Sequence, residues 1–206
     1  MIPYAELTNE SIGYLEIDST DLDRYQVVES LNAAQLELLN ILPIKFISNV
    51  VKSTNFHLQQ NVVAYQWPND WLRFLMAWVD YDAAIDVDNR GTELTIWIAD
   101  NFQVPMSEIA TASYPFIDIE IEGGYEIRPK PSANMSNGGR LRYVWKPMPI
   151  DASQPSLLNY NLKNLLIYKA VELSAMVDNY RPDLSKKFGE FYIRELNNFM
   201  PKKEKT

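Results

Sequence analysis

The residues with the clearest potential for chemistry are four aspartates in one short segment, Asp80, Asp82, Asp86 and Asp88. Carboxylates at alternating positions followed by a glycine are typical of a calcium-binding loop. Counted from Asp86, oxygen-bearing side chains take the first and third positions, and Gly91 takes the sixth. The fifth position is Arg90 and the twelfth is Trp97, where such a loop needs an oxygen ligand and a glutamate. The pattern therefore indicates a solvated acidic loop and no metal site.

Nucleophilic catalysis has little support in this sequence. His57 is the only histidine, there is no cysteine, and no Gly-x-Ser-x-Gly segment is present. The glycine pairs at 123–124 and 138–139 lack the spacing of phosphate-binding or dinucleotide-binding loops. We interpret His57 as a surface or turn histidine, and both glycine pairs as turn residues.

Two polar patterns allow ligand binding. Glu120 and Glu122 are paired carboxylates of the kind a glycosidase uses, but 27 acidic residues make such pairs frequent by chance. The segment 140–146 interleaves basic with aromatic residues, as strands that bind single-stranded nucleic acid do. Strand alternation gives the same pattern and is the interpretation we favour. It places Tyr143 and Trp145 inward, and Arg142 and Lys146 outward.

Helices are expected near the N-terminus and at the C-terminus. After an extended segment at 1–18, a helix starts at 19–23 with Thr20 as its cap and ends at about Leu42, before Pro43. Its apolar face comprises Val27, Leu31, Ala34, Leu38 and Ile41. A C-terminal helical pair follows, in which Pro182 takes the first position of the second helix. The apolar stripes of this pair comprise Leu158, Leu162, Leu165, Tyr168, Val171, Leu173 and Met176, then Leu184, Phe188, Phe191, Glu195 and Phe199.

Strands are expected between these helices. Residues 61–67 read as a strand, and the apolar run 71–78 fits either a helix or a buried strand. Alternation at 117–122 predicts a hairpin with a three-residue turn over 122–124 and a glycine in the left-handed conformation. In that register Ile121 lies opposite Tyr125, Ile119 opposite Ile127, and Asp118 opposite Arg128. Pro129 and Pro131 end the second strand, 132–139 forms a polar turn, and a third strand carries Leu141, Tyr143 and Trp145.

The totals describe an ordinary folded protein with an acidic surface. The chain has 206 residues, 47% hydrophobic residues and a formal net charge of −8. Such acidity disfavours broad binding of nucleic-acid phosphates, because that affinity comes from lysine and arginine. No signal peptide and no membrane-spanning run is expected. Trp67, Trp71, Trp78, Trp97 and Trp145 are expected mostly in the core, with some as interface anchors.

The order of several short motifs resembles the head-to-tail adaptor (connector) proteins of tailed bacteriophages. These motifs are a Tyr-x-x-Pro-x-Asp turn at 65–70, a hairpin with a Pro-x-Pro exit at 117–131, a Tyr-x-x-x-Pro strand at 143–147, and a long helical pair at 157–199. The likeness covers roughly residues 20–200. The segment 80–113 does not align with that pattern and forms a candidate insertion.

The resemblance implies a structural virion protein with no enzymatic activity and no cofactor. It would assemble in the host cytoplasm as a ring of about twelve copies, matching the portal above it and joining tail components below. DNA would pass through the lumen without sequence-specific binding. In similar proteins a C-terminal segment docks on the portal, and the corresponding residues here are Pro201, Lys202, Lys203, Glu204, Lys205 and Thr206.

The fold class that follows is α+β, a helical bundle carrying a small antiparallel β platform. We expect a single adaptor domain over 1–206, with a helical part at about 19–43 and 155–200, a β-rich part at about 60–150, and a flexible tail at 201–206. An alternative from another class is a carbohydrate-binding or carbohydrate-cleaving module, which would gather tryptophans and carboxylates in one pocket. A plain cellular scaffold protein is a third reading of the sequence.

Overall fold

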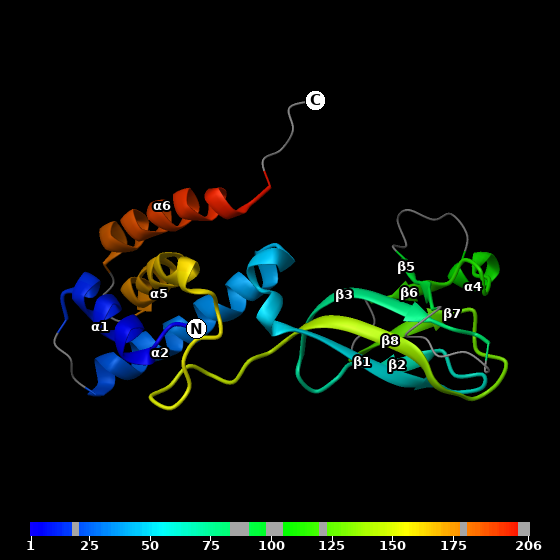
Figure 1. Cartoon of the computed structure of the whole chain (residues 1–206). Helices are drawn as coiled ribbons and strands as arrows, with labels where there is room; N and C mark the ends of the chain where they lie inside the picture. The colour runs from blue at the N-terminus through cyan, green and yellow to red at the C-terminus, as the bar shows by residue number, and fades with distance from the viewer. Residues whose placement is uncertain (18–20, 83–90, 98–104, 120–122, 178–180, 202–206) are drawn as a thin grey trace, which may run out of the picture. The chain divides into compact units, whose positions relative to one another are not determined.

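The computed structural model describes residues 1–17, 21–82, 91–97, 105–119, 123–177 and 181–201. The protein is α+β, as expected, with helices and two four-stranded sheets. The chain forms two compact units, which are labelled by their elements in Figure 1. The helical unit comprises Met1–Val50 and Lys146–Thr206, and the β unit comprises Val51–Trp145. In sequence, the β unit is therefore inserted between two parts of the helical unit.

Four helices of more than one turn build the helical unit: α1 (Tyr4–Leu15), α2 (Asp21–Ile41), α5 (Lys163–Val177) and α6 (Pro182–Phe199). Single 3₁₀ turns lie at η1 (Ile44–Phe46), η2 (Ser48–Val50) and η4 (Tyr160–Leu162). The end of α2 before Pro43 and the start of α6 at Pro182 confirm the boundaries predicted from the prolines.

Helix α1 contradicts the expectation of extended chain at the N-terminus. Its local signals are weak, because Pro3 makes no capping hydrogen bond through a side chain and Gly13 lowers helix propensity. Contacts with the rest of the helical unit stabilise this helix instead. Leu7, Ile12 and Leu15 are buried, and Lys163 of α5 donates to Glu6 at 2.8 Å and to Glu10 at 2.7 Å.

The predicted apolar face of α2 is confirmed at Val27, Leu31, Ala34 and Leu38, which are fully buried, while Ile41 is half-buried. The predicted stripe of α5 is correct up to Val171 but wrong at Met176, which is 53% exposed.

The predicted stripe of α6 is confirmed at Phe188, but the rest of the buried face differs from the one predicted. The buried residues of this helix are Ser185, Phe188, Gly189 and Tyr192, while Phe191 and Glu195 are only half-buried. Small residues let α6 approach α5 closely, because a Cβ on Gly189 would lie 3.2 Å from Oε1 of Glu172. Apolar periodicity alone gives no weight to such small residues.

The β unit contains two four-stranded sheets. In the first, the order is β1 (Val51–Leu58), β8 (Met135–Trp145), β3 (Trp71–Val79) and β4 (Thr92–Glu93). In the second, the order is β2 (Ala64–Gln66), β7 (Gly124–Arg128), β6 (Phe116–Asp118) and β5 (Thr95–Ile96). The run at 71–78 is thus a strand, and a short helix, α4 (Met106–Ile109), precedes β6. Because β5 and β6 are parallel, the platform is not purely antiparallel.

The hairpin of β6 and β7 has a register two residues away from the predicted one. Ile117 lies opposite Ile127, Phe116 opposite Arg128 and Asp118 opposite Glu126. A shift by two residues keeps every side chain on its face, so the inward placement of Ile117, Ile127 and Tyr125 is still correct. Gly123 has a φ of 76°. Glu122 of the predicted turn and Ile121, predicted opposite Tyr125, lie outside the described residues.

The second glycine pair is not a turn, contrary to the prediction. Gly138 and Gly139 lie inside β8, which begins at Met135 and is longer than expected. A Cβ on Gly139 would stand 2.2 Å from the ring of Phe56, its cross-strand partner. The glycine is needed because the Phe56 ring occupies the space of its missing side chain.

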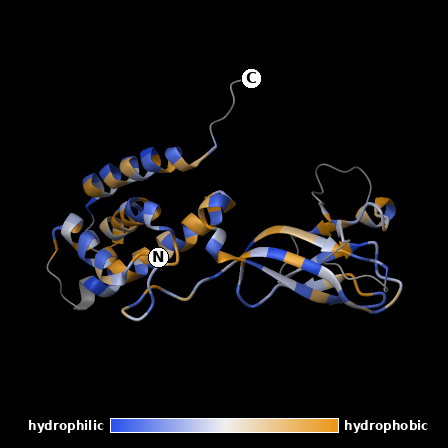
Figure 2. Ribbon diagram, viewed as in Figure 1, coloured by the Kyte–Doolittle hydropathy of each residue, from blue (hydrophilic) through white to orange (hydrophobic). Residues whose placement is uncertain are grey.

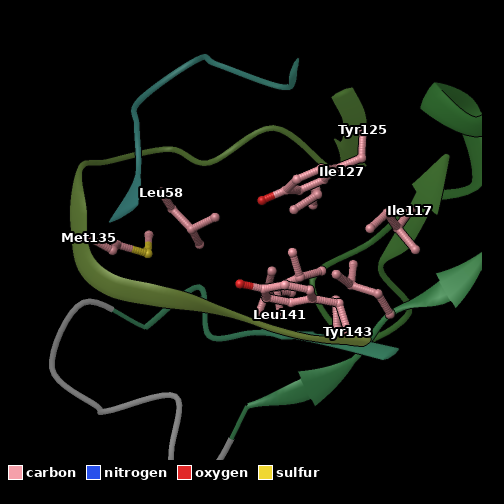
Figure 3. Close-up of a cluster of buried hydrophobic side chains, with 10 residues drawn as sticks. Leu58, Ile117, Tyr125, Ile127, Met135, Leu141 and Tyr143 are labelled. Atoms are coloured by element: carbon pink, nitrogen blue, oxygen red, sulfur yellow. The ribbon is translucent and has the colours of Figure 1, made fainter. Parts of the chain in front are cut away.

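The core of the β unit lies between the two sheets. Figure 3 shows Tyr125 and Ile127 of the second sheet facing Leu141 and Tyr143 of the first, with Leu58 and Met135 closing one end. Leu58, Ile117, Ile127, Leu141 and Tyr143 are each at most 3% exposed. The predicted inward positions of Leu141 and Tyr143 are confirmed.

Candidate interaction surface

The aromatic residues of the β unit pack on one another. Trp67 stacks on Trp71 with ring centroids 4.6 Å apart and contacts Tyr125 at the same distance. The carboxylate nearest in sequence is Asp70, which accepts bonds from the Lys52 ammonium and, at 2.8 Å, from the Tyr143 hydroxyl. Among the described residues, the carboxylate next to this cluster is thus engaged in contacts within the protein.

Asp70 and Tyr143 perturb each other's ionisation. Burial raises the pKa of Tyr143 to about 12, and the bond to Asp70 acts in the same direction. For Asp70 burial acts upward, but the bonds from Lys52 and Tyr143 outweigh it and lower the pKa. Lys52 also lies over the Trp145 ring, 4.5 Å from its centroid. These contacts tie the ends of β1, β3 and β8 together, a structural role.

The other residues considered for chemistry do not converge on a site. His57 is exposed, and its Nδ1 accepts the backbone N–H of Asn137 at 3.1 Å. Asp80 is buried and its Oδ1 accepts the backbone N–H of Asp82. Asp86, Asp88, Glu120 and Glu122 lie outside the described residues. Within the described part of the chain, no group of three or more acidic or histidine side chains could hold a metal ion.

The basic and aromatic residues of β8 lie on opposite faces. Tyr143 is buried between the sheets, whereas Arg142 is half-buried on the alternate face and Lys146 is exposed. The aromatic neighbour of the basic face comes from another strand, because the Arg140 guanidinium lies 5.9 Å from the Trp78 ring centroid. The alternation predicted for this strand is thus correct.

In the helical unit, a polar network fixes α6 on α2 and α5. Lys169 lies 3.2 Å from both Glu37 and Glu172, and the Tyr192 hydroxyl donates to Glu37 at 2.9 Å. Burial raises the pKa of Tyr192, and Glu37 raises it further. For Lys169 burial acts to lower the pKa, but Glu172 and Glu37 raise it. With α6 held in this way, the orientation of its outer residues is also fixed.

A shallow groove of about 250 Å³ lies between α2 and α5. Its lining is formed by Gln26, Glu29, Ser30, Ala33, Leu173 and Val177. Val177 is 77% exposed, although the same helix buries Leu166 and Ala170 completely. The lining is polar at Gln26, Glu29 and Ser30 and apolar at Ala33, Leu173 and Val177. Such a mixed lining is suited to a partner with an apolar side chain and a cation.

Helix α6 presents an apolar residue outward. Ile193 is 59% exposed and follows directly after the buried Tyr192. Residues spaced by about one turn share a helix face, so Lys186, Glu190, Ile193 and Asn197 form one strip, which we call the α6 strip. Its members are all exposed. Figure 2 shows hydrophobic and hydrophilic residues mixed around this helix.

Of the six residues expected to contact the portal, one lies within the described part of the chain. Pro201 is exposed directly beyond α6, and Lys202, Lys203, Glu204, Lys205 and Thr206 lie outside the described residues. The groove and the α6 strip were missed in the sequence. Ile193 could have been noticed, because it falls off any stripe that includes Phe188 and Tyr192. The groove could not, since it requires the pairing of two helices far apart in sequence.

Comparison with protein-family models and with curated proteins finds no match for this chain. None of the helices in the described ranges is both long enough and apolar enough to cross a membrane.

Proposed function

We propose that this chain is a structural ring subunit, a head-to-tail adaptor of a tailed bacteriophage. It joins the portal to tail components and leaves a lumen through which DNA passes. The observation that carries the proposal is the exposure of apolar side chains on the helical unit, among them Val177 in the α2–α5 groove and Ile193 on the α6 strip. Soluble chains expose such residues together where another protein covers them.

Two further points support this reading. The order of motifs along the chain resembles adaptor proteins, and the described carboxylates and the single histidine form no group of three that could hold a metal ion. The stacked tryptophans of the β unit lend no support to a sugar site, because their flat faces contact one another and Tyr125. A ring of about twelve copies would match the portal, and interface formation would be the whole mechanism.

The test is direct binding to portal rings. Purified chain is mixed with the portal protein of the same phage, sedimented through a density gradient, and viewed by electron microscopy. We expect co-sedimentation and a second ring layered under the portal. A chain that stays at the top of the gradient at every concentration, while portal rings are intact, would contradict the adaptor function.

A further inference from the structure

Within the proposed ring, the groove and the α6 strip raise the question of which surface covers each. We infer that the α6 strip of one copy docks in the α2–α5 groove of the next copy, so that the subunits join head to tail. This inference rests on the proposed function and adds to it the pair of surfaces that would link neighbouring subunits.

The two surfaces are complementary in polarity. The groove offers apolar contacts from Ala33, Leu173 and Val177, and the α6 strip offers Ile193 as the apolar side chain to fill it. An aromatic or aliphatic anchor held in a pocket of the partner forms the centre of many binding interfaces.

They are also complementary in charge. The groove is lined by a carboxylate, Glu29, which also takes part in a hydrogen bond with Tyr25, and the α6 strip has a cation, Lys186, at its N-terminal end. The acidic member of the strip, Glu190, can be met by the amide of Gln26 or the hydroxyl of Ser30, which both line the groove. The pair of Lys186 with Glu29 would favour this placement of the strip over others.

A contact between two unlike surfaces cannot close on itself in a pair. Each copy that inserts its strip still has an open groove, so the contact propagates until a ring closes or a filament grows. A contact between two like surfaces would instead stop at a dimer. The predicted geometry is therefore testable by breaking one surface at a time.

The experiment uses three full-length variants. Val177→Asp breaks the groove and leaves the strip, Ile193→Asp breaks the strip and leaves the groove, and Met148→Asp alters a 69% exposed methionine elsewhere in the helical unit as the control. The mass of each is measured by analytical ultracentrifugation, and folding is verified by circular dichroism. We expect assemblies from the parent and from Met148→Asp, and single chains from the other two.

Mixing supplies the decisive measurement. Val177→Asp and Ile193→Asp together retain one intact strip and one intact groove, so an equal mixture should form one-to-one pairs and nothing larger. A charge exchange sharpens this test: Glu29→Lys or Lys186→Glu alone should weaken assembly at least tenfold, and the double variant should restore it.

The outcomes separate this contact from the adaptor function. A parent chain that stays single, variants that assemble like the parent, or a mixture that forms no pairs would each overturn the contact. Portal binding is scored separately, so a chain that binds portal without using these surfaces keeps the adaptor function. A chain that assembles as described but does not bind portal loses the adaptor function and keeps the contact.

Discussion

The two units bury their apolar residues in different ways. In the β unit, the largest apolar side chains meet between two sheets, and half-buried aromatics such as Trp67 and Phe56 pack onto that same core. In the helical unit, Leu31, Leu38 and Leu166 are also fully buried, whereas Val177 and Ile193 are exposed to solvent. Exposed apolar side chains also occur in the β unit, at Tyr114 and Ile96. The difference between the units therefore lies in how each core is built, by packing between two sheets in one and between helices in the other.

The largest expected effect tests the closed core of the β unit. Ile117→Asp places a carboxylate at a fully buried position and should lower the free energy of unfolding by several kcal/mol, on the order of 3–5. Ile193→Asp in the helical unit should change it by less than about 0.5 kcal/mol, since that side chain is exposed. Urea denaturation followed by tryptophan fluorescence and circular dichroism measures both. Equal stability of the two variants would contradict the assignment of Ile117 as buried and Ile193 as exposed.

A neighbouring position gives an intermediate case. Ile119 is half-buried and packs against the same core, so Ile119→Asp should cost less than Ile117→Asp but clearly more than Ile193→Asp. The face assignment of the β6–β7 hairpin is wrong if Ile119→Asp melts like the parent protein.

The next effect compares one glycine from each unit. A Cβ on Gly124 would lie 2.3 Å from the backbone oxygen of Tyr65, so Gly124→Ala must push two paired strands apart. We expect a loss of about 1–3 kcal/mol. Gly13 in α1 has no atom within 4 Å of such a Cβ, and Gly13→Ala should raise stability by about 0.5–1 kcal/mol through helix propensity. Thermal melts of the two variants should thus shift in opposite directions.

A smaller effect concerns the loss of folding stability at acidic pH. The pKa of Asp70 is lower in the folded protein than its ordinary value of 3.8. Its bonds to Lys52 and Tyr143 therefore contribute stability above that ordinary value, and the contribution is lost as the pH falls through the lowered pKa. Because the pair is partly exposed, Asp70→Asn should cost less than about 1 kcal/mol at neutral pH. The loss in stability of the parent between pH 5 and pH 3 should be larger than that of Asp70→Asn; a parallel pH profile would contradict the assignment.

The smallest expected effect on stability comes from removing residues 202–206. The melting temperature should stay within about 1 °C of the parent, because surface changes away from packed groups are nearly neutral. Attachment to portal rings should weaken if this tail docks there. A truncated chain that binds portal as tightly as the full chain would move the portal contact to α6.

The sequence predicted what depends on local pattern. Pro43, Pro182 and Pro129 mark element ends correctly because proline restricts its own residue and the one before it. The apolar spacing in α2 and the alternation in β8 show their buried faces. What failed depends on contacts across the chain. Helix α1 forms on α5, the hairpin register is set by its partner strands, and Gly139 lies in a strand because Phe56 fills the space beside it.

The candidate interaction surface was even harder to predict from the sequence than the fold. Glu29 and Val177 lie in one groove only after α2 and α5 pair, and nothing in either segment alone indicates it. The α6 strip was missed for a different reason. The buried face of α6 includes Ser185 and Gly189, and a search for apolar residues gives such small residues no weight. Counting apolar residues therefore assigned Phe191 inward and overlooked Ile193.

The insertion of the β unit has a consequence for the order of events during synthesis. Residues 51–145 are contiguous, and their first and last strands pair directly, with Val51 opposite Val144. All strands that pair within this unit are therefore present once residue 145 has been synthesised. Helices α1 and α2 still lack their partners at that point, because α5 and α6, which complete their core, are encoded after it. At about 5–20 residues per second, the delay for the 95 intervening residues alone is roughly 5–20 s. Throughout that interval α2 has α1 beside it but lacks the cover that α5 supplies in the folded protein.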